Sequence, residues 1–127
     1  MRLRVRSWLA IASLNGALAV ALGAVAAHAL SQRLGAPQLS LFETAARYHM
    51  YHALALGLAA LAMQGAATRR AVCAAWAFLG GIVLFSGSLY LYALTEIHAL
   101  VFVTPVGGVA FIVGWVLLAL AAVRIKA

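Results

Sequence analysis

Acidic residues are nearly missing from this sequence. The 127 residues include two glutamates, Glu43 and Glu96, and no aspartate. A pair of carboxylates for acid–base catalysis and the aspartate of a Ser/His/Asp arrangement are therefore hard to supply, and no glycine-rich phosphate-binding loop is present. These gaps argue against an enzyme, so a membrane-embedded enzyme is the least favoured interpretation and no catalytic residue is assigned.

Cysteine is equally scarce, since Cys73 is the only one. A lone thiol has no disulfide partner within the chain, which excludes an internal disulfide framework. We interpret Cys73, near one end of an apolar segment, as a small packing residue.

Charged residues make up only 9% of the chain, whereas 67% of it is hydrophobic and the mean hydropathy is +1.07. A soluble domain of this length leaves roughly a third or more of its surface exposed, so it could not hide so much apolar surface. A bilayer is therefore the natural solvent. The net charge of +7 would suggest a nucleic acid in a soluble chain; here we expect the lipid bilayer as the partner and no nucleic acid.

Four apolar segments are each long enough to cross a bilayer. About 20 residues at 1.5 Å each span a hydrocarbon core of roughly 30 Å. The sequence thus predicts an all-α membrane protein, a four-transmembrane-helix antiparallel bundle that forms one domain. The predicted spans are residues 7–30, 43–64, 71–94 and 104–123.

Local signals set the predicted ends of these helices. Gly35 and Pro37 indicate a stop after the first span. Ser40 and Glu43 match a capping box at the start of the second, and Thr104, before a proline, is expected to cap the fourth.

The basic residues predict the orientation. Positively charged residues collect in cytoplasmic loops, and an even number of spans puts both termini and the 65–70 loop on one side. That side holds seven of the nine basic residues, so both termini are predicted to be cytoplasmic; the seven are Arg2, Arg4, Arg6, Arg69, Arg70, Arg124 and Lys126. The alternative is a cleaved signal peptide ending near "AVAAHA", but the apolar run is long for one.

Glycines seven residues apart predict where the helices pack closely. A spacing of seven returns to the same helix face, and small residues there let backbones approach in a membrane. Three spans carry such a pair, namely Gly16 with Gly23, Gly80 with Gly87, and Gly107 with Gly114.

Four stretches in order, "GAVAAHAL", "FETAARYHMYHALAL", "LFSGSLYLYAL" and "TPVGGVAFIVGW", resemble the YgdD-like small membrane proteins, the family called domain of unknown function number 423. The resemblance covers nearly the whole chain. It implies a four-helix protein of bacterial inner membranes, with eukaryotic relatives, and no established activity. It also places His28, His49 and His52 within family motifs, but not His98.

Polar side chains are expected to form one layer in the outer half of the bundle, with Asn15 as an exception deeper in the first span. Such groups are costly in lipid and usually face the bundle interior, where they pair or mark a functional pathway. Glu43 and Arg47 are four apart and are expected to pair. The candidate ligand or network residues are His28, Glu43, Arg47, Tyr48, His49, His52, Ser86, Ser88, Tyr90 and Thr104.

The sequence leaves several functions open for this layer. It fits a structural network, or the ligand site of an accessory subunit, either as a homo-oligomer or in a larger membrane complex. The alternatives are a small channel or transporter for protons, ions or a small solute, a Zn or Cu site formed by His28, His49 and His52, and a b-type haem held by His28 and a second-span histidine. No cofactor is assigned.

Overall fold

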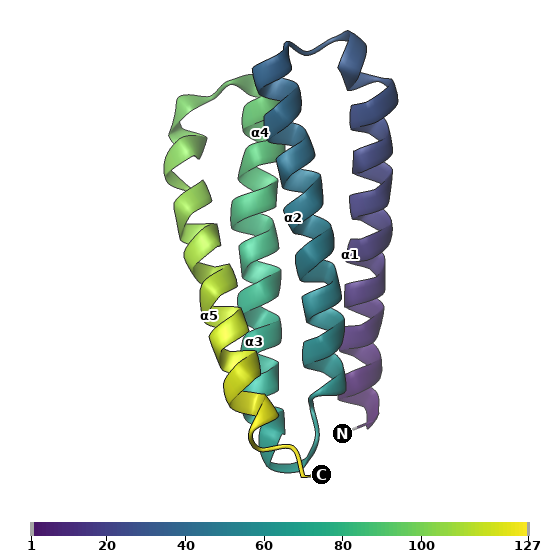
Figure 1. Ribbon diagram of the computed structural model, residues 1–127, viewed down its shortest axis with the longest axis vertical. Helices are drawn as coiled ribbons and strands as arrows, with labels where there is room; N and C mark the ends of the chain where they lie inside the picture. Colours follow the sequence, from purple (N-terminus) through teal and green to yellow (C-terminus); the bar gives the residue numbers. More distant parts are fainter. Residues whose placement is uncertain (1, 127) are drawn as a thin grey trace.

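The computed structural model describes residues 2 to 126, which form four helical rods lying side by side in alternating directions (Figure 1). The third rod changes from α- to π-helix and back along its length. The helices are α1 (Arg2–His28), α2 (Ala36–Leu61), α3 (Thr68–Gly81), the π-helix η3 (Ile82–Ser86), α4 (Gly87–Thr95) and α5 (Thr104–Ala122), and short 3₁₀ turns join the rods at η1 (Leu30–Gln32), η2 (Gly65–Ala67) and η4 (His98–Phe102).

Within the described residues, three helical segments are long and apolar enough to cross a membrane, namely Arg4–Gln32, Gly65–Thr95 and His98–Ala122. The prediction of an all-helical membrane chain is therefore confirmed at this level. The segment α2 is not among them, because arginine, tyrosine and histidine residues interrupt its middle at residues 47 to 52.

The rods are arranged in a row rather than in a closed square. The first rod packs on α2, α2 packs on the third rod, and α5 packs on the other side of that third rod. The backbones of α2 and α5 rarely approach each other, and the two helices meet through long side chains such as His52 and Phe111. This arrangement leaves an opening between α2 and α5 along one face of the third rod.

Two predicted helix starts are wrong in detail. Gly35 is the N-cap of α2 and Pro37 lies in its first turn, so the Gly-Ala-Pro stretch starts a helix as well as ending the previous turn. Ser40 therefore lies inside α2 and caps nothing. The residue before α5 is Val103, which has no side chain able to cap, and the Thr104 hydroxyl bonds elsewhere.

Only some of the six predicted packing glycines lie at close helix contacts. A Cβ at Gly107 would lie 2.2 Å from the backbone nitrogen of Phe85, and one at Gly114 would lie 2.7 Å from the Phe78 ring. At Gly16, Gly23 and Gly80 a Cβ would meet nothing within 4 Å, so that expectation is wrong there; at Gly87 the nearest atom is 3.8 Å away.

Other small residues make the close contacts that were expected at Gly16, Gly23 and Gly80. In α1 the buried positions are Ala12, Ala19 and Ala26, which keep the seven-residue spacing on a neighbouring stripe. In α3 the contact is at Gly81, where a Cβ would lie 2.3 Å from the Phe111 ring. The seven-residue spacing indicates that small residues line a contact face. Which small residue faces the neighbouring helix depends on how the helix is rotated about its own axis.

Candidate functional site

The polar network centres on His49 and lies near the middle of the bundle, deeper than the layer that the sequence predicts. Asn15 is 13 residues from the end of α1 at His28, and His49 is 13 residues from the start of α2 at Ala36. Both residues are therefore roughly 20 Å from the α1–α2 turn, near the middle of their helices. Their side chains are hydrogen-bonded at 3.0 Å, so Asn15 belongs to the network instead of standing apart from it.

The partners of His49 fix the direction of its hydrogen bonds. Asn15 donates through Nδ2 to the Ile11 carbonyl at 2.9 Å, which leaves Asn15 Oδ1 to accept from His49 Nε2. In the neutral imidazole, Nδ1 is then an acceptor, and it receives the Tyr90 hydroxyl at 3.0 Å. A directed chain thus runs from Tyr90 on α4 through buried His49 on α2 to Asn15 on α1.

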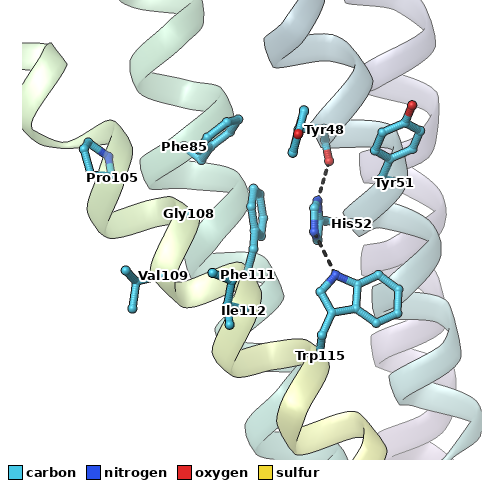
Figure 2. A pocket seen from close by; sticks show the side chains of 10 residues that line it. All are labelled: Tyr48, Tyr51, His52, Phe85, Pro105, Gly108, Val109, Phe111, Ile112 and Trp115. Atoms are coloured by element: carbon cyan, nitrogen blue, oxygen red, sulfur yellow. Dashed lines mark hydrogen bonds between the residues drawn. The ribbon is translucent and has the colours of Figure 1, made fainter.

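His52 has both ring nitrogens occupied. Trp115 can only donate, so its Nε1–H bonds to His52 Nε2 at 3.1 Å, and His52 Nδ1 donates to the Tyr48 carbonyl at 2.7 Å. The ring also stacks on Phe111, with centroids 3.5 Å apart and planes 7° apart. His52 is therefore held as a neutral imidazole with no free lone pair for a metal (Figure 2).

The three candidate histidines do not form a shared metal or haem site. His28 is exposed in the last turn of α1, and its backbone is roughly 20 Å from the level of His49. Among residues 2 to 126, no group of three or more His, Cys, Asp or Glu residues comes together. The hypothesis of a His28–His49–His52 site is wrong, because His28 lies at the end of α1 whereas α2 already starts at Ala36, 13 residues before His49.

Two hydroxyls satisfy the backbone near the π-helix. Ser88 donates to the Phe85 carbonyl at 3.0 Å and lies 2.6 Å from the Thr104 hydroxyl. The Thr104 hydroxyl is also 3.3 Å from the Leu100 carbonyl, to which it can donate. Each hydroxyl has one proton, so when Ser88 donates to Phe85, Thr104 shares its proton between Ser88 and Leu100. Ser86, also in this segment, is fully buried and its hydroxyl has no partner within the described residues.

Arg47 and Glu43 lie on the exposed side of α2. No hydrogen bond or ion pair of either side chain occurs in the part of the chain that is described, so the expected pairing is not formed. Arg47 is 11 residues into α2, roughly 17 Å from its start. A charged residue so close to the middle of an apolar bundle is a candidate functional group.

A groove of about 700 Å³ opens between α2 and α5, and we call it the α2–α5 groove. Figure 2 shows rings from three rods turned toward it: Tyr48, Tyr51 and His52 from α2, Phe85 from the π-helix, and Phe111 and Trp115 from α5. The remaining lining residues are Pro105, Gly108, Val109 and Ile112. The volume is within the range of about 300–1,000 Å³ that is usual for ligand sites.

A second, smaller cavity of about 450 Å³ borders the His49 chain. Asn15, His49, Ser88 and Tyr90 line it together with aliphatic residues of α1, η3, α4 and η4. The structure thus groups Ser88, Tyr90 and His49 around one cavity, and Tyr48 and His52 around the other.

Several site residues were missed by the sequence reasoning. Phe111 and Trp115 were not singled out, although they are four apart and so share one face of α5, as Tyr48 and His52 share one face of α2. This matching spacing of rings on two helices was the available signal. Phe85 carried no comparable signal, because its direction depends on the π-helix.

Apolar helices of membrane-spanning length, with a ring-lined groove on the bundle surface, define a small helical integral membrane protein. The chain belongs to the family described as protein of unknown function (DUF423), whose sequence profile matches residues 22–108. The predicted family resemblance is confirmed.

Two relatives illustrate how far the similarity extends. The UPF0382 inner membrane protein YgdD of Escherichia coli K12 is 44% identical over 124 residues, which cover 95% of this chain and 92% of the relative. The UPF0382 membrane protein YwdK of Bacillus subtilis 168 is 41% identical over 121 residues, covering 94% and 98%. No solved structure matches the chain.

Proposed function

We propose that this protein is a four-span inner-membrane protein whose α2–α5 groove binds a lipid-soluble molecule, as the ligand-binding or accessory subunit of a membrane process. The observation that carries the proposal is the groove itself. Its walls are aromatic and aliphatic, and the polar atoms of His52 are already paired inside the protein. Such a lining suits a hydrocarbon ligand that needs few hydrogen bonds.

The alternative of a channel or transporter has less support. The half of the bundle near the termini contains a buried apolar cluster that includes Trp8, Leu56, Met63 and Phe78. A polar pathway from the His49 chain would have to cross this cluster. The described residues there offer alanine, leucine and aromatic side chains in place of partners for an ion or proton.

The groove proposal is tested by photolabelling with palmitic acid that carries a diazirine on its chain. We expect label on the α5 peptide that contains Ile112 and Trp115. In Gly108→Leu the added side chain extends into the groove, because a Cβ at Gly108 would lie 3.8 Å from the Phe85 ring, and labelling should fall severalfold. Val116→Leu, an exposed α5 position outside the groove, is the matched control. Equal labelling in both variants would refute the proposal.

The proposed orientation has both termini in the cytoplasm and α2 as the fourth span. Support comes from the positions of the basic residues: the start of α1, the α2–α3 turn and the end of α5 share one end of the bundle (Figure 1). This end carries seven of the nine basic residues.

Labelling of single cysteines tests the orientation. In a Cys73→Ala background, a membrane-impermeant maleimide should reach His98→Cys in spheroplasts, because η4 lies at the opposite end from the termini. Arg69→Cys should react only after the membrane is opened. The reverse pattern would contradict the proposed orientation, and labelling of both positions in intact spheroplasts would mean that the third rod, which lies between them, does not cross the membrane.

A further inference from the structure

We propose that the occupant of the α2–α5 groove is a phospholipid with a zwitterionic phosphate–ammonium headgroup, one acyl chain lying in the groove, the phosphate at Arg47 and the ammonium at Glu43. This inference rests on the proposed binding function of the groove. It adds to that proposal the chemical class of the ligand and the direction in which the ligand lies along the groove.

Arg47 supplies the first argument. Its side chain is exposed, has no partner within the described residues, and starts roughly 17 Å along α2. An unpaired charge at such depth is costly in lipid, and a long side chain relieves the cost by reaching toward the surface. A phosphate oxygen next to the groove would satisfy the guanidinium with charge-assisted hydrogen bonds.

The order of charges along α2 supplies the second argument. Glu43 lies one turn nearer the start of α2 than Arg47, on the same exposed face. The start of α2 is at the bundle surface whichever side that end faces, so the acid is always shallower than the base. A phospholipid has the same order, because its phosphate joins the glycerol and its ammonium lies further out. A purely anionic headgroup would meet Arg47 but would be repelled by Glu43.

The groove continues from these charges in the direction that an acyl chain requires. Tyr51 is one turn deeper than Arg47 on the same face and lines the groove, and in Figure 2 its hydroxyl points toward the start of α2. Val109, Ile112 and Trp115 then form one apolar wall along α5. Polar and apolar parts of the site thus follow each other as headgroup and chain do.

Trp115 makes the inference testable, because its ring lines the groove. The full-length protein is reconstituted in bilayers containing phosphatidylethanolamine or phosphatidylglycerol with brominated acyl chains, and quenching of tryptophan fluorescence is measured. Trp8 and Trp76, in contact with each other on α1 and α3, lie outside the groove; the Trp115→Phe variant measures their background.

We expect the brominated phosphatidylethanolamine to bind at Trp115 at least about threefold more tightly than phosphatidylglycerol, a ratio that one charge-assisted hydrogen bond can produce. Glu43→Gln should remove this preference or shift it toward phosphatidylglycerol, because Glu43 is the group that distinguishes the ammonium. Arg47→Gln should weaken quenching by both lipids, because both carry the phosphate that it binds. Arg33→Gln, which removes an exposed charge at the end of η1, should change nothing.

The possible failures are distinct. If Gly108→Leu lowers quenching but the two headgroups bind equally in every variant, the groove binds chains without reading headgroups and the inference is overturned. If phosphatidylglycerol binds more tightly in the unmodified protein, Arg47 selects an anionic lipid, which also overturns it. If Gly108→Leu has no effect on quenching by either lipid, the groove is not a binding site and the proposed function fails with it.

Discussion

Replacing Gly107 with alanine should lower the free energy of unfolding by about 1–3 kcal/mol, the usual cost of overpacking a tightly packed site. A Cβ there would lie 2.2 Å from the backbone nitrogen of Phe85 and 2.7 Å from its Cα. Those atoms belong to the π-helix, so the added methyl group must displace backbone instead of turning a side chain. The loss should appear as a lower midpoint in thermal unfolding of the detergent-solubilised protein, followed by circular dichroism.

Gly108→Ala is the matched control for this substitution. The same methyl group, one residue further along α5, would contact the Phe85 ring at an ordinary distance of 3.8 Å, and alanine also favours the helix over glycine. Its midpoint should be unchanged or slightly raised. Equal midpoints for the Gly107 and Gly108 variants would mean that α5 does not pack on the π-helix backbone as described.

The helical fold was largely predictable from the sequence, because long apolar runs and short loops allow few alternatives. The 71–94 prediction falls within the third rod, α3 through α4, and the 104–123 prediction nearly coincides with α5. The start of α2 was not predictable from capping motifs alone. Ser40 and Glu43 have the right spacing for a capping box, but Gly35 caps the helix five residues earlier and Pro37 lies in its first turn.

The late predicted start of α2 explains most of what the sequence could not place in the site. The predicted span starts α2 at residue 43 instead of Ala36, which places His49 near the level of His28 and leaves Asn15 deeper than both. With the observed ends, Asn15 and His49 are equally deep and bonded. The π-helix of the third rod is a second feature that the sequence did not predict. It turns Phe85 into the α2–α5 groove, and no residue pattern indicates a π-helix there.

Removing the imidazole of His49 should destabilise the bundle by roughly 1–3 kcal/mol. His49→Leu deletes both hydrogen bonds of the ring and leaves the Asn15 Oδ1 and Tyr90 hydroxyl without their partner. An orphaned polar group costs about 1–3 kcal/mol in a protein interior. The average hydrogen bond between helices in a membrane contributes only about 0.6 kcal/mol. We therefore expect a loss smaller than twice the cost of one unpaired polar group. His28→Leu, a histidine exposed in the last turn of α1, is the control and should leave the midpoint unchanged.

Combining substitutions separates a directed chain from simple loss of packing. In the triple variant Asn15→Leu, His49→Leu and Tyr90→Phe, all three polar groups are gone and none is left unpaired. Replacing both partners of a buried hydrogen bond by apolar groups is nearly neutral, so the triple variant should recover part of the stability that His49→Leu loses. Thermal unfolding in the same detergent gives both values. If the triple variant is less stable than His49→Leu by the sum of the losses measured for Asn15→Leu and Tyr90→Phe alone, then Asn15, His49 and Tyr90 act independently. The hydrogen-bonded chain through His49 would then contribute no coupling energy.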